Sequence, residues 1–407
     1  MNDSTVGLVI DNRAALRGEP GLHAFITGVS DYPYLPIATR ENQADHSEPH
    51  YGLRQLASPA LSAYRLARAL LLWAPSLTVP IATVRLLLAP SNDERLLEMR
   101  LARRAAPATW DNFAIEAKAW RQDVATHREN VGLFYFGGHG LQRYVNDQIL
   151  LLKDFGDGKG APLNHGVDSQ RLLRGMAPSD HYPEMGRRQL FLFDACRNTP
   201  PAALERDVER VRDIWAIHKT EVDSRSCAIF YATSPGYSSY ANRGDKTVFV
   251  RAFINAVNGV GAERSGGFIS DRAAWTVSAT GMANAIAELI KNDPTPFSKD
   301  QDMVPLGARS DFIFREFKRA PRVKFTIRVS PAKDHKRARL ALKDDRAGLV
   351  CETGAPIAPY PFERVLNAGI YLSELQLELS EERTSPVQVR AFEVHPLRRS
   401  VLLRSGQ

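Results

Sequence analysis

The chain has 407 residues, of which 44% are hydrophobic and 24% charged, and its formal net charge is +7. This composition is typical of a globular protein, and the length exceeds that of one ordinary domain of about 100–200 residues. Three cysteines, Cys196, Cys227 and Cys351, form no paired framework and no metal knuckle, which favours a reducing compartment over a secreted disulfide scaffold. We therefore expect a reducing compartment, the cytoplasm.

Neither a signal peptide nor a membrane span is predicted. The first twenty residues, "MNDSTVGLVIDNRAALRGEP", lack a continuous apolar core followed by a small-residue cleavage site. The longest uncharged stretch, residues 69–84, is shorter than the roughly 20 residues that span a bilayer, and Pro75 and Pro80 interrupt it.

The positive charge is concentrated at the C-terminal end of the chain. From Pro321 onward there are fifteen basic and ten acidic residues, so +5 of the net charge lies in the last 87 residues. Such a part could face nucleic acid, an acidic partner or anionic lipid, but charges of both signs are interspersed along it. A solvated surface is the better interpretation, and we expect no nucleic-acid partner.

The first three quarters of the chain alternate between apolar runs and helical patterns. The apolar runs are continuous, which favours strands buried on both faces, as in a parallel sheet. They cover residues 22–29, 82–89, 131–137, 189–195 and 227–233. Helical patterns cover residues 58–73, 109–127, 202–218, 247–258 and 272–291. This alternation predicts an α/β fold, a doubly wound and mostly parallel sheet with helices on both faces.

The pattern changes near Lys318 to short runs that alternate with period two. These runs are residues 323–329, 338–344, 370–379 and 387–394. No long helical pattern follows, so we expect a small all-β sandwich. The predicted domains are residues 1–318, which carry the chemistry, and residues 319–407, an accessory module for docking or regulation.

Two of the predicted strands end in residues that can perform chemistry. "GLFYFGGHG" ends in His139 and Gly140, and "LFLFDACRN" carries Asp194 and Cys196 near its end. Working residues of open α/β sheets gather at the carboxyl ends of parallel strands. A histidine beside a cysteine can take the thiol proton and later protonate a leaving amine. Each residue alone is more often structural, a turn histidine or a small buried cysteine, but the matched positions favour a catalytic pair.

The glycines beside His139 leave room for a substrate backbone. The N–H groups of Gly140 and Cys196 are candidates for binding the oxyanion of a tetrahedral intermediate. Cys227 and Cys351 have no comparable surroundings, and packing suffices to explain them.

These residues resemble the caspase–metacaspase superfamily of cysteine peptidases, most closely its bacterial members. "FYFGGHG" matches the histidine motif and "LFLFDACRN" the cysteine motif, while "HAFITGVSDYPYLP" and "IFYATSPGYSSYA" are similar to the opening strand and to the strand behind the substrate groove. The resemblance covers roughly residues 20–317. It implies that Cys196 is the nucleophile and His139 the general acid and base.

The resemblance also implies where substrate binds. Asp194 holds the place of an acid in the pocket for the residue before the scissile bond, which predicts cleavage after Arg or Lys. A second pocket acid of the family is missing, since Ser62 stands in its place. Asp31 is either a substitute for that acid or a turn residue that caps its own backbone. Ser234 is expected in the substrate groove.

Two further segments admit two interpretations each. Asp154 and Asp157 suggest calcium, but two acids in a glycine-rich loop more often make a turn, so we expect no required metal or other cofactor. Residues 197–226 correspond to the linker that caspases cut on activation. The alternative, which we favour, is a solvated helix with an apolar stripe that includes Ile214 and Trp215. The candidate cleavage sites are Arg206, Arg210, Arg212, Lys219 and Arg225.

The sequence thus predicts a cysteine endopeptidase that acts on a protein or peptide substrate, with a C-terminal module that binds a regulatory protein. By analogy with the family, it would serve a signal-driven defence or cell-death system in bacteria. The alternative is a catalytically silent adaptor that keeps the fold and binds partners through its β domain. The intact His139 and Cys196 pair favours the enzyme.

Overall fold

The computed structural model separates into two compact units, one formed by Met1–Asn255 with Ser278–Arg315 and the other by Ala256–Val277 with Glu316–Gln407. It describes residues 6–35, 52–95, 103–142, 148–159, 161–197, 211–218, 223–233, 244–264, 274–295, 303–306, 311–380, 383–398 and 400–405. The assignment of separate roles to residues 1–318 and 319–407 stays a prediction.

The first unit is built around a mostly parallel sheet with the strand order β1-β3-β2-β5-β9-β10-β13, and β4 pairs with β3. Strands β2, β3, β5, β9 and β10 run parallel, whereas β1 and β13 pair antiparallel at the two ends. Every residue of β2, β3 and β5 is buried, so the continuous apolar runs correctly predicted parallel strands covered on both faces. The bounds are β1 (Leu8–Asp11), β2 (Leu22–Val29), β3 (Ile81–Ala89), β4 (Ala106–Pro107), β5 (Val131–Gly138), β9 (Arg188–Ala195), β10 (Ser226–Tyr231) and β13 (Val304–Leu306).

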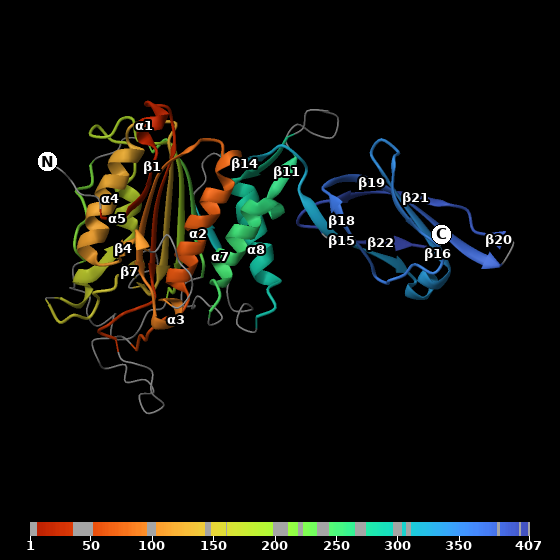
Figure 1. Cartoon of the computed structure of the whole chain (residues 1–407), viewed down its shortest axis with the longest axis horizontal. Coiled ribbons are helices and arrows are strands. Elements are labelled where there is room, and N and C mark those ends of the chain that lie inside the picture. The colour runs from red at the N-terminus through yellow and green to blue at the C-terminus, as the bar shows by residue number, and fades with distance from the viewer. Residues whose placement is uncertain are drawn as a thin grey trace. The chain divides into compact units, whose positions relative to one another are not determined.

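Helices cover both faces of this sheet, as predicted. Figure 1 shows α2, α7 and α8 on one face and α4 and α5 on the other. Among the described residues, no helix combines the length and the apolar character needed to cross a membrane. The helices are α1 (Arg13–Leu16), α2 (Pro59–Trp73), α3 (Asn92–Arg95), α4 (Trp110–Val124), α5 (Ser169–Gly175), α7 (Val248–Asn255) and α8 (Ala279–Lys291), with 3-10 turns at Ala74–Ser76, Pro162–His165 and Ala332–Arg337.

Two of the predicted helices were wrong in part. The pattern over 272–291 contains a strand, Trp275–Ser278, and the helix begins only at Ala279, where the Ser278 hydroxyl accepts a hydrogen bond from the Gly281 amide at 3.1 Å. Residues 211–218, the described part of the pattern over 202–218, form no helix. Ile214 and Trp215 are both buried there because they follow tertiary contacts rather than a helical period.

The described residues form two further small sheets. One joins β6 (Gly140–Gln142), β7 (Gln148–Leu151) and β8 (Gly166–Asp168), and begins directly after His139. The other joins β11 (Ala262–Arg264), β12 (Trp275–Ser278) and β14 (Ile313–Phe317). Neither was predicted, because their strands are too short to show a pattern in the sequence.

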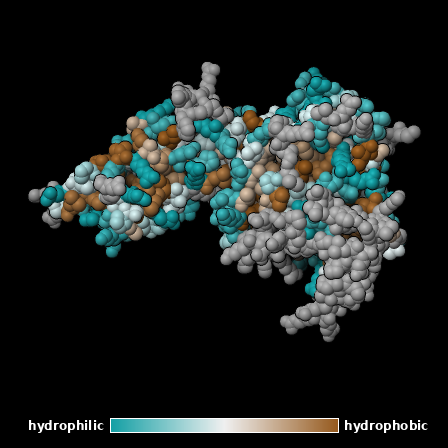
Figure 2. Space-filling view, turned by 180° about the vertical axis from the view of Figure 1, so that it is seen from behind, coloured by the Kyte–Doolittle hydropathy of each residue, from teal (hydrophilic) through white to brown (hydrophobic). Residues whose placement is uncertain are grey.

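The C-terminal region forms two sheets, β18-β15-β22 and β17-β16-β19-β20, with β21 paired to β19. Phe325 of one sheet stacks on Phe392 of the other with ring centroids 5.5 Å apart. The predicted β-sandwich is therefore present, and hydrophobic residues reach its surface among hydrophilic ones on the face that Figure 2 shows. The strands are β15 (Arg322–Ser330), β16 (Ala338–Asp344), β17 (Leu349–Thr353), β18 (Phe362–Asn367), β19 (Gly369–Ser380), β20 (Arg383–Thr384), β21 (Gln388–Val394) and β22 (Ser400–Arg404).

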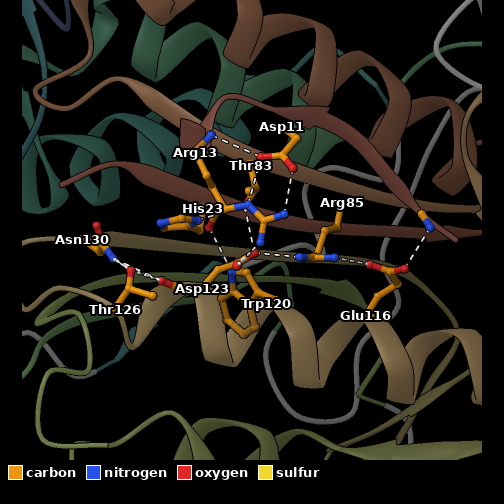
Figure 3. Close-up of polar contacts among 11 residues, drawn as sticks. Asp11, Arg13, His23, Thr83, Arg85, Glu116, Trp120, Asp123, Thr126 and Asn130 are labelled. Atoms are coloured by element: carbon orange, nitrogen blue, oxygen red, sulfur yellow. Dashed lines mark hydrogen bonds and ion pairs between the residues drawn. The ribbon is translucent and has the colours of Figure 1, made fainter. Parts of the chain in front are cut away.

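A buried charged cluster lies between β3 and α4 (Figure 3). Arg85 donates to Glu116 Oε2 at 2.6 Å and to Asp123 Oδ2 at 2.7 Å, and all three side chains are buried. His23 lies 2.9 Å from the Thr83 hydroxyl, and burial lowers its pKa to about 4. His23 lies near the start of β2, whereas the candidate catalytic residues follow the ends of strands. The charged cluster therefore connects α4 to the edge of the sheet opposite the candidate catalytic residues.

Candidate active site

The two strands that carry the candidate residues are neighbours in the sheet. Strands β5 and β9 pair in parallel, and the last pair in the register is Gly138 with Ala195. The next residues of the two strands are His139 and Cys196, respectively. Two residues 57 positions apart in the sequence thus leave the sheet side by side at its carboxyl edge.

His139 is held in one tautomer by a backbone carbonyl. Its side chain is buried, with only 6% of the residue exposed, and Nε2 lies 2.5 Å from the carbonyl oxygen of Arg54. A carbonyl oxygen can only accept, so Nε2 carries the proton and Nδ1 of the neutral ring is left as an acceptor. Burial lowers the pKa of His139 to about 4, although the Arg54 carbonyl opposes this shift by favouring the charged ring. The imidazole is therefore neutral at pH 7.

Tyr32, from the loop after β2, fixes the backbone of His139. Its hydroxyl accepts from the His139 amide at 2.8 Å and donates to the Leu151 carbonyl at 3.1 Å. The Tyr32 and His139 rings lie 4.9 Å apart. Burial raises the pKa of Tyr32 well above its usual value, so the hydroxyl keeps the proton that it donates.

Gly140 lies against the backbone of Cys196. A Cβ atom at position 140 would overlap the Cys196 carbonyl oxygen, so no residue other than glycine fits there without a backbone shift. Gln148 reaches the same carbonyl, since its Nε2 donates to the Cys196 oxygen at 3.2 Å. The segments that follow the two strands are thus joined around Cys196.

The amide of Gly140 points away from strand β7. Gly140 pairs with Leu150, and the Leu151 amide donates to the His139 carbonyl at 3.0 Å. In an antiparallel ladder this arrangement makes Gly140 and Leu150 a pair without hydrogen bonds to each other, so the Gly140 N–H is directed to the other side. Because β6 is an edge strand of its sheet, that N–H faces away from the sheet.

The three cysteines differ in their surroundings. None forms a disulfide, and Cys196 is partly exposed. Burial raises the pKa of Cys227 to about 11 and also raises that of Cys351, which keeps both thiols protonated at neutral pH. Packing explains these two cysteines, as the sequence suggested.

Comparison with known proteins agrees with this geometry. Residues 97–284 match the family model of the caspase domain. The chain therefore carries a caspase domain. The match supports a member of the caspase–metacaspase superfamily of cysteine peptidases, as the sequence motifs implied. No curated protein matched the chain.

The matched segment contains both His139 and Cys196 but begins after β3. Tyr32 and the Arg54 carbonyl, which hold His139, come from the preceding part of the chain. Neither was singled out from the sequence. The first tyrosine in "SDYPYLP" was the available signal, but only the fold brings its hydroxyl to the histidine.

Asp194 of the caspase domain lies in a buried cluster of hydroxyl groups. It is only 2% exposed, and its Oδ2 accepts from the Tyr135 hydroxyl at 3.0 Å and from the Thr247 hydroxyl. The Thr247 hydroxyl also accepts from the Val250 amide at 3.2 Å, so Asp194 is linked to the first turn of α7. The Ser62 hydroxyl accepts from the Thr247 amide at 2.9 Å. Ser62, which stands where the resemblance implies a second acid, therefore belongs to the same cluster as Asp194.

Asp31 lies in a different environment. Its carboxylate is 3.2 Å from Arg95 and 3.6 Å from Lys153, and it is partly exposed. These ion pairs are the described contacts of its carboxylate, and its backbone N–H donates to the Ala89 carbonyl at 2.8 Å. Ser234, the remaining predicted substrate contact, lies outside the described residues.

The two acids that suggested calcium make structural contacts. Both carboxylate oxygens of Asp154 accept from the Trp110 amide at 3.1 Å, which caps the start of α4, and burial raises the pKa of Asp154. Asp157 lies 3.5 Å from His165 and accepts from the Lys159 amide at 2.9 Å. In the described ranges, no three His, Cys, Asp or Glu side chains are grouped as metal ligands.

The linker after Cys196 is partly described. The guanidinium carbon of Arg212 lies 3.5 Å from the centre of the Trp110 ring, and Arg225 is buried with its guanidinium 2.6 Å from Asp223. Of the candidate self-cleavage sites in the described part, Arg225 is thus inaccessible to an active site in this conformation. The sites outside the described residues are Arg206, Arg210 and Lys219.

Proposed function

We propose that this chain is a cysteine endopeptidase in which Cys196 and His139 form the catalytic dyad. The observation that carries the proposal is the register of β5 and β9, which brings both residues to one edge of the sheet, in a segment that matches the caspase domain. The alternative of a silent adaptor rests on the missing second acid, where Ser62 stands, and is not favoured because the chain keeps both dyad residues and the contacts that hold His139.

The reaction follows from the tautomer of His139. Nδ1 accepts the Cys196 thiol proton, and the sulfur attacks the carbonyl carbon of the scissile bond. The oxyanion is bound by the N–H groups of Gly140 and Cys196. The protonated imidazole then gives its proton to the leaving amine as the C–N bond breaks, and the acyl group stays on sulfur. Water, deprotonated by Nδ1, hydrolyses the thioester and restores the thiol and the neutral ring.

We propose cleavage after Arg or Lys, with Asp194 as the acid that recognises the cation. Asp194 precedes Cys196 by two residues at the end of β9, and residues two apart in a strand line the same face. Asp31, by contrast, already faces two cations, Arg95 and Lys153. A carboxylate near the nucleophile attracts a cationic side chain by Coulomb interaction. This supports Asp194 over Asp31 as the specificity residue.

The C-terminal β module is proposed to bind a regulatory protein. Val389 is more than half-exposed and Leu402 about half-exposed on its strands, and such side chains are common in binding patches. The superfamily analogy supports a signal-driven defence or cell-death role in a bacterium, and the lack of disulfides supports the cytoplasm. V389E and L402E should leave hydrolysis of small peptides unchanged and slow the cleavage of a protein target that needs this module.

Hydrolysis of fluorogenic peptides ending in Arg, Lys or Asp tests the enzyme. Wild type should cleave after Arg or Lys, whereas C196A and H139A should not. The matched control is C227A, which removes a buried thiol outside the dyad and should keep the activity. Equal signals from wild type and C196A would refute the peptidase.

The same peptides test the specificity residue. D194N keeps an oxygen acceptor for the Tyr135 and Thr247 hydroxyls but removes the charge, so cleavage after Arg and Lys should fall by at least about tenfold, as expected for one lost charged contact. D31N is the matched control and should cleave after Arg and Lys as wild type does. Cleavage by wild type only after Asp would contradict the role of Asp194 and leave the dyad intact.

A further inference from the structure

A small cavity lies between α4 and the segment that follows the catalytic cysteine. Its volume is about 240 Å³, and no carboxylate lines it. The cavity is smaller than the roughly 300–1,000 Å³ of pockets for drug-sized ligands, so it suits a small group. Its lining includes Lys118, Arg121 and Gln122 of α4 together with Tyr182, Trp215 and His218.

Arg121 is buried in this cavity, and within the described part of the chain it makes no ion pair. The residue is 4% exposed, and its Nε atom is buried without a hydrogen-bond partner among the described residues. Its guanidinium carbon lies 4.1 Å from the centre of the Tyr182 ring and 5.0 Å from that of Trp215. Burial lowers the pKa of Arg121, which reflects the cost of a charge kept from water.

Two other buried arginines are neutralised by carboxylates. Arg85 contacts both Glu116 and Asp123, and Arg225 contacts Asp223. A buried charge without its counter-charge is costly inside a protein. Arg121 therefore has the environment of a residue whose anionic partner is not part of the described chain.

One neighbour of Arg121 adds to its positive charge. Lys118 precedes it by about one helical turn on α4 and lines the same cavity. His218 stacks on His181 with ring centroids 3.9 Å apart, and its pKa is lowered by burial and by the like charges of His181 and Arg121. The cavity is thus suited to an anion.

Three acids close to this cavity in sequence are already paired with other arginines, and a fourth, Asp180, is exposed. None of these three acids is therefore left to neutralise Arg121. The pairs are Asp123 with Arg85 and Arg13, Glu184 with Arg128 at 3.0 Å, and Asp213 with Arg171 at 2.7 Å.

We propose that this cavity binds the phosphate group of a small ligand, with Arg121 and Lys118 as the binding residues and His218 at its side. The planar guanidinium, held near two aromatic rings, presents N–H groups that match two phosphate oxygens. The lysine adds a second, mobile charge from the same helix face.

Binding would affect the segment that follows the nucleophile. Trp215 packs over Gly175, where a Cβ atom would overlap the indole nitrogen, and the indole N–H donates to the Arg171 carbonyl at 3.4 Å. Because α4 and residues 215–218 both line the cavity, a bound phosphate joins them. Residues 211–218 are then held against the helix more firmly in the loaded protein.

Inorganic phosphate is the probe, used on the full chain in a C196A background so that self-cleavage plays no part. Phosphate should raise the Tm of this protein and change the tryptophan fluorescence saturably, while chloride at equal ionic strength should not. R121Q should abolish the response, and K118Q, at an exposed position, should raise the Kd about 5- to 10-fold, as expected for one lost charged contact. R128Q is the matched control, since Arg128 is exposed and paired with Glu184, and should respond as the parent does.

Three results would overturn the proposal. They are an equal response in R121Q and R128Q, no response to phosphate in the parent, and a response to citrate without one to phosphate, which would assign the cavity to carboxylates. K118Q guards against misfolding of R121Q, because its side chain is exposed. The outcome is independent of peptidase activity, which the C196A background lacks.

Discussion

Removal of the Tyr32 hydroxyl tests how His139 is held. Tyr32→Phe keeps the ring against the imidazole but deletes the group that accepts from the His139 amide at 2.8 Å and donates to the Leu151 carbonyl at 3.1 Å. Both hydrogen bonds are buried. The two backbone groups must then stay unpaired or move.

The size of the effect follows from these two hydrogen bonds. A buried polar group that loses its partner costs about 1–3 kcal/mol, so two such groups lower the free energy of unfolding by about 2–6 kcal/mol if nothing moves. If the loop moves to pair them, His139 shifts from its place beside the Arg54 carbonyl. A shift of about 1 Å at a catalytic group can cost about 100-fold in rate, so we expect kcat to fall by about 10- to 100-fold.

Peptide hydrolysis, urea denaturation and the pH dependence of Cys196 alkylation by iodoacetamide measure these effects. Burial holds the pKa of His139 at about 4, so a loosened His139 in Y32F should titrate nearer to its ordinary value of about 6.5. The control is Tyr371→Phe in the β module, which removes one hydroxyl that donates to the Asn367 carbonyl at 3.0 Å and should leave kcat unchanged. A destabilised Y32F with wild-type kcat and an unchanged alkylation profile would show that Tyr32 only packs.

Three further predictions follow from the described contacts. Gly140→Ala should lower kcat for peptide hydrolysis at least about tenfold. The new Cβ overlaps the Cys196 carbonyl oxygen and displaces that carbonyl group. Arg85→Met should lower the free energy of unfolding by about 3–5 kcal/mol in urea, because Glu116 is left buried without its cation. His23 has a pKa of about 4 in the folded chain and about 6.5 in the unfolded chain, so the unfolded chain binds the proton more readily. The free energy of unfolding should therefore fall by up to about 3 kcal/mol as the pH drops from about 6.5 to 4. Urea denaturation at each pH measures this fall.

Each of these has its own control. Gly354→Ala adds a Cβ where nothing lies within 4 Å and should be silent, so equal losses in both glycine variants would contradict the steric argument. Arg85→Met combined with Glu116→Gln should recover part of the lost stability, and no recovery would remove the unpaired carboxylate as the cause. His23→Gln should reduce the fall in the free energy of unfolding at acidic pH only in part, since His139 has a similarly lowered pKa. If the free energy of unfolding of this variant falls with pH as steeply as that of wild type, His23 is ruled out as the cause.

Much of the fold could be predicted from local patterns. The apolar run 22–29 is strand β2, the pattern over 58–73 is helix α2 with Pro59 in its first turn, and the alternating run 338–344 is strand β16. These elements are encoded by the spacing of buried side chains, which the sequence displays directly. The prediction for 211–218 failed because the buried residues of that segment follow tertiary contacts rather than a helical period.

The sequence by itself determined the class of the fold, the two candidate catalytic residues and the family motifs around them. Only the tertiary structure decided what surrounds them: Tyr32 and the Arg54 carbonyl on His139, and Thr247 on Asp194. Periodicity is a property of neighbouring residues, so it can be read along the chain. The contacts of His139 and Asp194 join residues 53 to 107 positions apart and depend on strand register and loop paths, which arise only when the whole sheet is assembled.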